Sequence, residues 1–220
     1  MLFRDRRDGG RALAGKLGSY AARGDVLVLA LPRGGVPVAY EVAEQLGAPL
    51  DIFLVRKLGL PGHPEYAMGA IASGGVRVLD PDLIRRAGVP SAEVERVTRE
   101  EERELQRRER LFRSNQPPVD VEGKIVLLVD DGLATGASMR AAIQAVRRLR
   151  PRRVVVAVPV APESTCRELH ALVDDVVCVA TPHPFEAVGR FYDDFEQIGD
   201  EEVRTLLRAA AARIGAEASA

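Results

Sequence analysis

Cysteine, tryptophan and aromatic residues are scarce in this sequence. Its 220 residues include two cysteines, no tryptophan and only 5% aromatic residues. Two cysteines are too few for a disulfide framework or a four-cysteine zinc site, which excludes small proteins stabilised by either. Cys166 and Cys178 both lie in apolar periodic stretches, so we expect two half-buried, unreactive thiols.

The sequence also lacks an excess of charge of one sign and any long hydrophobic run. Its 31 Lys and Arg residues against 32 Asp and Glu residues leave a net charge of −1, which gives no reason to expect a nucleic-acid or membrane partner. The longest apolar runs, residues 26–32 and 154–161, are far shorter than the ~20 residues that span a bilayer. The first residues carry charges with no apolar stretch behind them, which predicts no secretory signal. We expect a soluble, cytoplasmic protein.

Short apolar runs alternate regularly with helical patterns along the chain. Each run is rich in Val, Ile and Leu on both faces, as in strands buried from both sides of a sheet. The alternation predicts an α/β fold in which a five-stranded, mostly parallel sheet has helices on both faces. We expect one domain over residues 1–220, with its core at about 20–180. The predicted strands are 26–31, 50–55, 125–129, 154–160 and 176–180, and the predicted helices include 136–150 and 200–214.

Two segments interrupt this alternation. Residues 56–80 contain several glycines and prolines, with Gly74-Gly75 between two apolar runs, which predicts a long mobile loop and a hairpin. In residues 91–114, 13 of the 18 residues from 93 to 110 are charged, with a narrow apolar stripe. Opposite charges four residues apart favour a helix there. This helix is either solvated and packed along one seam, or a contact between copies of the chain in a homo-oligomer.

The segment that carries chemistry is residues 125–138, IVLLVDDGLATGAS. A buried strand cannot continue through two carboxylates, so we expect Asp130 and Asp131 to emerge, exposed, at its carboxyl end, where open α/β sheets bind ligands. The small-residue turn behind them leads into a helix and exposes backbone N–H groups that suit a phosphate, with the hydroxyls of Thr135 and Ser138 beside them. Carboxylates next to a phosphate cradle suit the vicinal hydroxyls of a ribose 5-phosphate, with or without Mg²⁺.

The same residues are open to other interpretations. A Walker A loop is excluded because no Gly-Lys-[Ser/Thr] occurs here. An acid pocket of the receiver type needs a further Asp at the end of a later strand, whereas Asp174 and Asp175 precede one. A tight strand–helix turn with a solvated acid pair and no ligand is the other alternative.

Residues 129–138, VDDGLATGAS, resemble the ribose-phosphate signature of the type I phosphoribosyltransferases, and the order of elements is similar over about residues 20–195. By this resemblance, Asp130 and Asp131 hold the ribose hydroxyls of phosphoribosyl pyrophosphate. The resemblance also implies Mg²⁺, held chiefly by substrate oxygens, which these acids approach mainly through water or substrate. The 5-phosphate of the substrate then lies in the turn formed by Ala134, Thr135, Gly136, Ala137 and Ser138.

A second stretch, residues 31–36 with the sequence LPRGGV, ends the first predicted strand. Gly34 and Gly35 let backbone N–H groups approach a ligand closely. In the family this place is the pyrophosphate loop, which often contains a non-proline cis peptide, so the resemblance assigns Arg33 to the leaving pyrophosphate. Arg56 and Lys57 follow the second predicted strand, where nothing in the sequence requires two cations structurally. The family's mobile loop follows this strand, so the resemblance assigns both to pyrophosphate as well.

The same loop contains His63, Glu65 and Tyr66. We interpret His63 as a solvated loop residue. Glu65 and Tyr66 either take part in catalysis or only pack the loop.

Aromatic residues concentrate in the segment at about 181–200, with three Phe and one Tyr between residues 185 and 195. They form either a small aromatic core under a loop or, by the resemblance, a hood over the acceptor base on which Phe185 or Phe191 stacks. The segment is similar to the hood of hypoxanthine-guanine enzymes, which carry an Asp where this chain has Ala134, as adenine enzymes do. The acceptor is therefore undetermined.

Together these residues predict Mg²⁺-dependent transfer of a phosphoribosyl group from phosphoribosyl pyrophosphate to a nitrogenous acceptor, first of all a nucleobase, as in nucleotide salvage. Arg33, Lys57, Asp130 and Asp131 are the predicted catalytic residues. A non-catalytic sensor of phosphoribosyl pyrophosphate or a nucleotide is one alternative, and a transferase acting on another amine is a second. A regulator that bound RNA would need a clustered basic face, for which residues 147–153 are the candidate, and the helix dipole explains most of that cluster.

Overall fold

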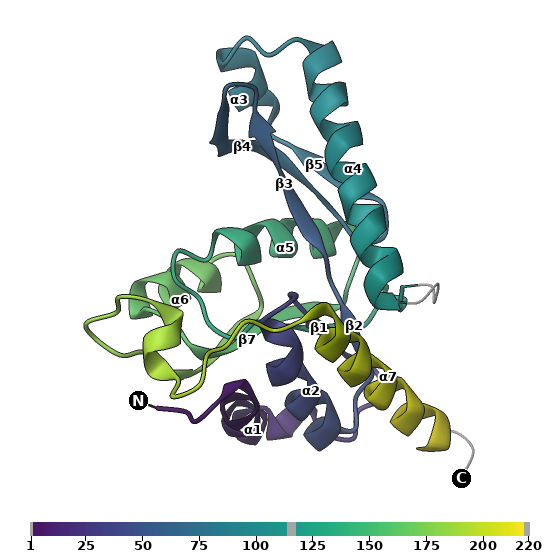
Figure 1. Ribbon diagram of the computed structural model, residues 1–220, viewed down its shortest axis with the longest axis vertical. Coiled ribbons are helices and arrows are strands. Elements are labelled where there is room, and N and C mark those ends of the chain that lie inside the picture. Colours follow the sequence, from purple (N-terminus) through teal and green to yellow (C-terminus); the bar gives the residue numbers. More distant parts are fainter. Residues whose placement is uncertain (1, 114–117, 218–220) are drawn as a thin grey trace.

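Figure 1 shows the computed structural model of the chain, which describes residues 2–113 and 118–217, with the side chains of residues 64, 65, 216 and 217 left out. A central parallel sheet is covered by helices, and a smaller antiparallel sheet rises away from it. The predicted fold class is therefore confirmed, and the second sheet adds to it.

The central sheet consists of β1 (Val26–Ala30), β2 (Leu50–Ile52), β6 (Ile125–Val129), β7 (Arg153–Val160) and β8 (Asp175–Ala180). Its strands are all parallel, in the order β2-β1-β6-β7-β8. Every residue of β1 and β6 is buried, as their unbroken apolar sequence predicts. Ala30 lies opposite Val129, so β1 and β6 end at the same level. The segments that follow them therefore emerge side by side.

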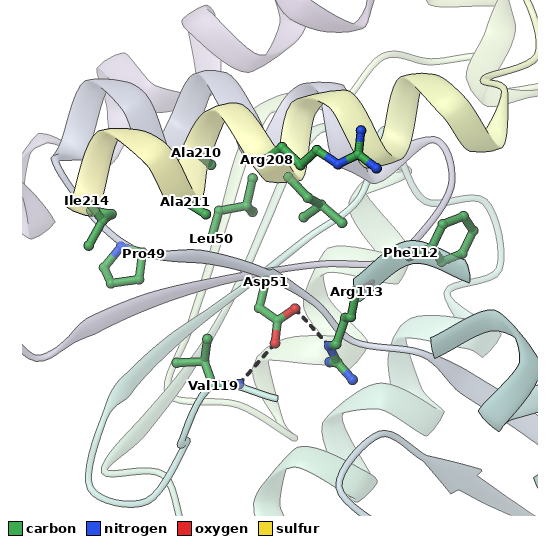
Figure 2. A pocket seen from close by; sticks show the side chains of 11 residues that line it. Pro49, Leu50, Asp51, Phe112, Arg113, Val119, Arg208, Ala210, Ala211 and Ile214 are labelled. Carbon is green, nitrogen blue, oxygen red and sulfur yellow. Dashed lines mark hydrogen bonds and ion pairs between the residues drawn. The ribbon is translucent and has the colours of Figure 1, made fainter. Parts of the chain in front are cut away.

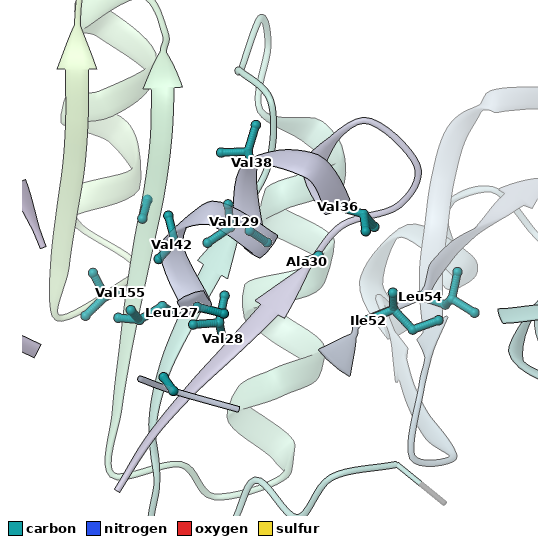
Figure 3. Close-up of a cluster of buried hydrophobic side chains, with 14 of the residues drawn as sticks. Val28, Ala30, Val36, Val38, Val42, Ile52, Leu54, Leu127, Val129 and Val155 are labelled. Atoms are coloured by element: carbon teal, nitrogen blue, oxygen red, sulfur yellow. The ribbon is translucent and has the colours of Figure 1, made fainter. Parts of the chain in front are cut away.

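Helices cover both faces of this sheet. On one face lie α1 (Arg6–Lys16), α2 (Gly35–Leu46) and α7 (Asp200–Glu217), and on the other α5 (Ala137–Arg148) and α6 (Glu163–His170). Figure 3 shows the first layer, in which valines of α2 pack on the apolar side chains of β1 and β6. Cys166 is buried and Cys178 half-buried, and both are free thiols. No helix in the described ranges is long and apolar enough to cross a membrane.

Residues 55–113 form a separate unit, here called the arm. It contains β3 (Val55–Leu60), β4 (His63–Ala72), β5 (Val76–Leu79), α3 (Pro81–Arg86) and α4 (Ser91–Arg113). The three strands pair antiparallel in the order β3-β4-β5 and rise from the end of β2 (Figure 1).

The arm corrects two predictions. The strand predicted at 50–55 is interrupted, because β2 ends at Ile52 and Val55 already belongs to the second sheet. The long loop predicted from residue 56 is a β-hairpin of β3 and β4, although the hairpin around Gly74-Gly75 is confirmed, with φ of +80° and +73° at its glycines. The register of β3 against β4 shifts around Gly59, which removes the regular period-2 pattern by which a strand is recognised.

The predicted charged helix is α4, and residue 114 of that prediction lies outside the described residues. Its buried residues include Val94, Thr98, Leu105 and Phe112, which are spaced so that they form one seam. Along this seam α4 packs against β3 and β4 of the arm and against α7. The helix is thus packed along a single side, with most of its charged residues on the remainder and Arg113 buried at its end.

A buried ion pair fixes the end of α4 to β2 (Figure 2). The Arg113 Nε lies 3.0 Å from Asp51 Oδ1, and Arg113 Nη2 donates to the Ile52 carbonyl at 2.7 Å. The other Asp51 oxygen accepts from the Val119 amide at 3.1 Å. Only 6% of the Arg113 side chain and 10% of the Asp51 side chain are exposed. Both ends of the arm are therefore attached to β2.

Asp51→Ala is expected to lower the free energy of unfolding by about 3 kcal/mol, because it removes one of the two carboxylates that pair with the buried Arg113 guanidinium, the other being Glu109, and leaves the Val119 amide without its acceptor. Glu100→Ala is the matched control, since it removes an ion pair with Arg96 on the exposed side of α4 and is expected to cost at most about 1 kcal/mol. Urea unfolding of both variants beside the wild type measures the two values. Equal losses would contradict the anchoring role of Asp51.

Candidate active site

The candidate site lies where β1 and β6 end together. The Leu31 amide donates to the Val129 carbonyl at 2.8 Å, which extends the pairing one residue past β1. Residues 32–35 then turn into α2, while Asp130 and Asp131 follow β6. The structure therefore brings the Pro-Arg-Gly-Gly turn and the acid pair together, as the parallel arrangement predicts.

The two glycines of this turn lie against the acid pair. A Cβ atom on Gly34 would overlap Asp131 Oδ2, and one on Gly35 would be 2.7 Å from the Val129 carbonyl oxygen. No other residue fits at either position without moving the acids or the strand. The sequence analysis explained these glycines by the close approach of a ligand to the backbone. The structure shows a second reason, which is that the acid pair and β6 leave no room for a side chain. The Pro32–Arg33 peptide is cis, which agrees with the resemblance to the pyrophosphate loop.

The acid pair is mostly buried, so the expectation of two exposed carboxylates was wrong. Only 15% of the Asp131 side chain is exposed, and the Asp130 Oδ1 accepts from the Asp131 amide at 2.9 Å. Burial raises the pKa of Asp130 well above its ordinary value of 3.8, and the neighbouring Asp131 raises it further. Burial also raises the pKa of Asp131, against the opposing effect of Arg6.

Arg6, in the first turn of α1, is the cation that meets the acid pair. Its Nε donates to Asp131 Oδ2 at 2.8 Å and its Nη1 to the Glu196 carbonyl at 2.8 Å. Sequence reasoning missed this residue. A signal existed, because Arg6 falls on the helical stripe that continues through Leu13 and Leu17, where an arginine needs a buried partner.

The hood is built from both ends of the chain. The amides of Leu2 and Phe3 donate to the Phe191 carbonyl at 3.0 Å, so residues 2–5 join the segment predicted at 181–200. The Tyr192 hydroxyl donates to the Asp131 carbonyl at 2.5 Å. A Cβ atom on Gly132 would be 2.5 Å from Val188 of the hood. The hood therefore packs directly on the acid pair and the residue after it.

The aromatic residues of the hood pack on one another. The rings of Phe185 and Phe191 have centroids 5.0 Å apart, and Tyr192 stacks on Phe195 at 5.1 Å. This agrees with the interpretation as a small aromatic core. Both Phe185 and Phe191 are half-buried rather than fully enclosed, and stacking of either ring on a base stays a prediction.

The predicted phosphate turn, residues 134–138, lies at the start of α5. Gly136 adopts φ of +69°, a left-handed conformation that favours glycine, and α5 begins at the next residue. The Ala134 carbonyl accepts from the Thr165 hydroxyl at 2.8 Å, and the Thr135 carbonyl accepts from the Arg140 guanidinium. These bonds fix the turn through its carbonyls. The first amides of a helix have no partner within it, so they are available to an anion.

The predicted pyrophosphate cations occupy three different settings. Arg33 Nη1 lies 3.4 Å from Asp200 Oδ1 at the start of α7. Lys57 lies on β3 and lines, together with Ala137, a groove of about 710 Å³ between the arm and α5. Arg56 forms a 2.5 Å ion pair with Glu101 of α4, so the view that this cation has no structural use was wrong.

His63 and Tyr66 lie at the beginning of β4, on the arm, and both are exposed. Their rings meet edge to face at 6.4 Å between centroids. The Glu65 side chain lies outside the described residues. A catalytic part for Glu65 or Tyr66 therefore stays a prediction.

The basic cluster at 147–153 has acidic partners. Arg147 pairs with Asp174, Arg150 with Glu122 and Arg152 with Asp25, at 3.4, 3.0 and 2.5 Å. Three of the five arginines between residues 147 and 153 are therefore paired with carboxylates.

Comparison with known proteins decides the family. A family model described as a phosphoribosyl transferase domain matches residues 65–195, which include the acid pair and the predicted phosphate turn. The chain belongs to the phosphoribosyl transferase family. The type I resemblance of residues 129–138 is thereby confirmed. The Pro-Arg-Gly-Gly turn and Arg6 lie outside the segment that this family model matches.

Individual relatives agree with this membership. The chain is 47% identical over 206 residues to a Mycobacterium tuberculosis protein named as a putative phosphoribosyl transferase, a match that covers 94% of this chain and 46% of that protein. It is 31% identical over 129 residues to the bifunctional protein PyrR of Chloroflexus aurantiacus, covering 57% of this chain and 65% of PyrR. The chain thus spans about half the length of the M. tuberculosis relative.

One solved structure matches nearly the whole phosphoribosyl transferase chain. It is the protein TT1426 from Thermus thermophilus, with 45% sequence identity and a TM-score of 0.84. The match covers 94% of this chain and 98% of TT1426, so the two proteins share nearly all of the fold.

Asp130→Asn is expected to stabilise the phosphoribosyl transferase fold at neutral pH. Because the native pKa of Asp130 lies above its ordinary value of 3.8, the native state holds this proton to a higher pH than the unfolded chain does. The wild-type free energy of unfolding therefore decreases as pH rises from about 3.8 through the native pKa, and the variant lacks this decrease.

Urea unfolding of both proteins between pH 4 and pH 8 checks this prediction. The difference in stability between the variant and the wild type should be small at pH 4, grow as the pH rises toward the native pKa of Asp130, and stay constant above that pKa. The Asn side chain keeps the Oδ1 acceptor for the Asp131 amide, which limits other effects of the change. A wild type that is the more stable protein at pH 8 would contradict the assignment.

Proposed function

We propose that this chain transfers the phosphoribosyl group of phosphoribosyl pyrophosphate to a nitrogenous acceptor and releases pyrophosphate, in a reaction that requires Mg²⁺. The observation that carries the proposal is the convergence of three parts at one end of the sheet. These are the partly buried acid pair Asp130 and Asp131, the glycine turn packed on it, and the predicted phosphate turn at the start of α5.

The acid pair and the phosphate turn bind the sugar. The ribose hydroxyls donate to the Asp130 and Asp131 carboxylates, and the 5-phosphate accepts from the amides at the start of α5. Both sets of groups are held in place before the substrate arrives, which orients C1 for attack. The acids also lie where negative charge stabilises the oxocarbenium-like ribose of the transition state.

In the reaction the bond from C1 to the pyrophosphate oxygen breaks and a bond from C1 to the acceptor nitrogen forms. The electron pair of the broken bond leaves with pyrophosphate, and the acceptor nitrogen releases its proton to solvent. Arg33 and Lys57 compensate the charge on the leaving group. Arg33 exchanges Asp200, its partner in the free protein, for a pyrophosphate oxygen.

The residues present fit a Mg²⁺ ion that comes with the substrate. In the described residues no group of three or more His, Cys, Asp or Glu side chains could hold a metal, and Asp131 Oδ2 is bonded to Arg6. A hard ion such as Mg²⁺ keeps waters and takes few protein ligands, so substrate oxygens supply most of its ligands, with Asp130 and Asp131 beside them. When bound, the ion neutralises charge on the pyrophosphate.

The acceptor we propose first is a nucleobase, as in nucleotide salvage. The hood packs on Gly132, the residue after the acid pair, through Val188, and its Phe185 and Phe191 rings are only half-buried. Stacking on such rings suits a planar base.

A screen of nucleobases and other amines for pyrophosphate release tests the proposal. Each acceptor is incubated with phosphoribosyl pyrophosphate, with and without Mg²⁺, using the wild type and a double variant with Asp130→Asn and Asp131→Asn. The proposal expects Mg²⁺-dependent release with at least one acceptor and none in the double variant. Binding of phosphoribosyl pyrophosphate without turnover of any acceptor would instead support a sensor.

Arg33→Ala is expected to lower the affinity for pyrophosphate by roughly 10- to 150-fold, the range of a charge-assisted contact worth ~1.5–3 kcal/mol. The affinity for ribose 5-phosphate should change much less, because that ligand has no group on the pyrophosphate side. Calorimetry with both ligands measures the two effects. Arg85→Ala on the surface of α3 removes a 76%-exposed cation and is the control expected to change neither.

Lys57→Ala in the same series is expected to reduce kcat more than pyrophosphate affinity if the arm moves toward the site during the reaction. If Arg33→Ala and Lys57→Ala both leave pyrophosphate binding and turnover untouched, the leaving-group assignment is wrong.

A further inference from the structure

Arg6 is held on three sides at the point where α1, the hood and the acid pair meet. Its Nε donates to Asp131 Oδ2 at 2.8 Å, and its Nη1 donates to the Glu196 carbonyl of the hood at 2.8 Å. The guanidinium carbon lies 3.8 Å from the centre of the Phe195 ring. Only 10% of the side chain is exposed. The guanidinium plane is therefore fixed by two hydrogen bonds and a cation–π contact.

The Asp131 carboxylate is held in turn. Its Oδ2 receives the Arg6 bond and lies in the space that a Cβ atom on Gly34 would occupy. Its main-chain carbonyl accepts from the Tyr192 hydroxyl of the hood. The backbone and one carboxylate oxygen of Asp131 are thus both bonded to groups outside β6.

We propose that Arg6 is a positioning residue for the ribose site, which holds one oxygen of Asp131 so that the other is presented to a ribose hydroxyl. This inference rests on the proposed function, because it assumes that Asp131 binds the ribose. Arg6 itself does not contact the sugar: its hydrogen bonds go to Asp131 and to the hood.

An arginine suits this role better than a lysine. Its planar fork makes two bonds in fixed directions while its face lies on an aromatic ring, whereas an ammonium group is a point charge without a plane. A lysine at position 6 could reach Asp131 but would not keep the Glu196 bond and the ring contact together. Arg6→Lys is therefore expected to preserve only part of the function.

The test measures ligand selectivity by calorimetry, with ribose 5-phosphate and inorganic pyrophosphate as probes. Arg6→Gln is expected to weaken ribose 5-phosphate binding at least about tenfold, the lower range for a lost charge-assisted hydrogen bond, and to change pyrophosphate binding less than about twofold. Arg6→Lys should recover part of the loss. Arg7→Gln is the matched control, since Arg7 is the next residue, is paired with Glu41 of α2 and is about half exposed. It should change neither affinity.

If Arg6→Gln does not fold, a second variant tests the same inference. Phe195→Leu removes the ring beneath the guanidinium and leaves both hydrogen-bond partners of Arg6 in place, so it should also weaken ribose 5-phosphate selectively. Equal losses of both ligands in these variants, or normal ribose 5-phosphate affinity in a folded one, would overturn the inference.

The measurement requires no turnover, which separates it from the test of the proposed function. If the Arg6 variants lose ribose 5-phosphate affinity selectively but the wild type transfers to no acceptor, the proposed reaction is wrong and the role of Arg6 is supported. A chain that binds pyrophosphate but no ribose 5-phosphate overturns both.

Discussion

Two adjacent carboxylates are largely shielded from water at the end of β6, and much of the surrounding structure serves to make this possible. A buried carboxylate is costly unless it is paired or accepts hydrogen bonds. Arg6 of the N-terminal helix donates to the Asp131 carboxylate, and Tyr192 of the hood donates to the main-chain carbonyl of Asp131. The turn at Gly34 and Gly35 closes the remaining side without a side chain. Segments from both ends of the chain are therefore required at one place.

Under the proposed function, this arrangement serves the binding of a sugar at a cost in stability. Hydrogen bonds from ribose hydroxyls to carboxylates are stronger in a site shielded from water than on an open surface. The same shielding raises the pKa of Asp130 and so opposes its ionisation at the acid end of the pH range. In that case the hydroxyls of the bound ribose favour the charged form of Asp130, which burial disfavours in the free protein. Sites of this kind commonly trade stability for function.

Local patterns in the sequence were enough to predict the five parallel strands, the charged helix and the acid pair followed by a glycine turn into a helix, because each is encoded by residues close together in the chain. The strand β3 was not recognised, since Arg56 and Gly59 break its apolar alternation and its pairing shifts register. The burial of the acid pair was missed for a different reason. The residue that covers it, Arg6, is 125 positions away, and no local pattern links the two.

The buried pair of Asp51 and Arg113 has a consequence for how the molecule can change over evolution. The arm leaves the sheet just after Ile52, and its last residue returns to donate a hydrogen bond to the carbonyl of that same Ile52. An insertion whose two ends meet leaves the strand order around it unaffected, and its length adds only slowly to the entropy cost of closing it. We therefore expect the outer part of the arm to tolerate shortening, extension or exchange by recombination, provided that this closure is kept. The outer part of the arm is in this sense a replaceable module, joined through β3 and α4 to a sheet that is not.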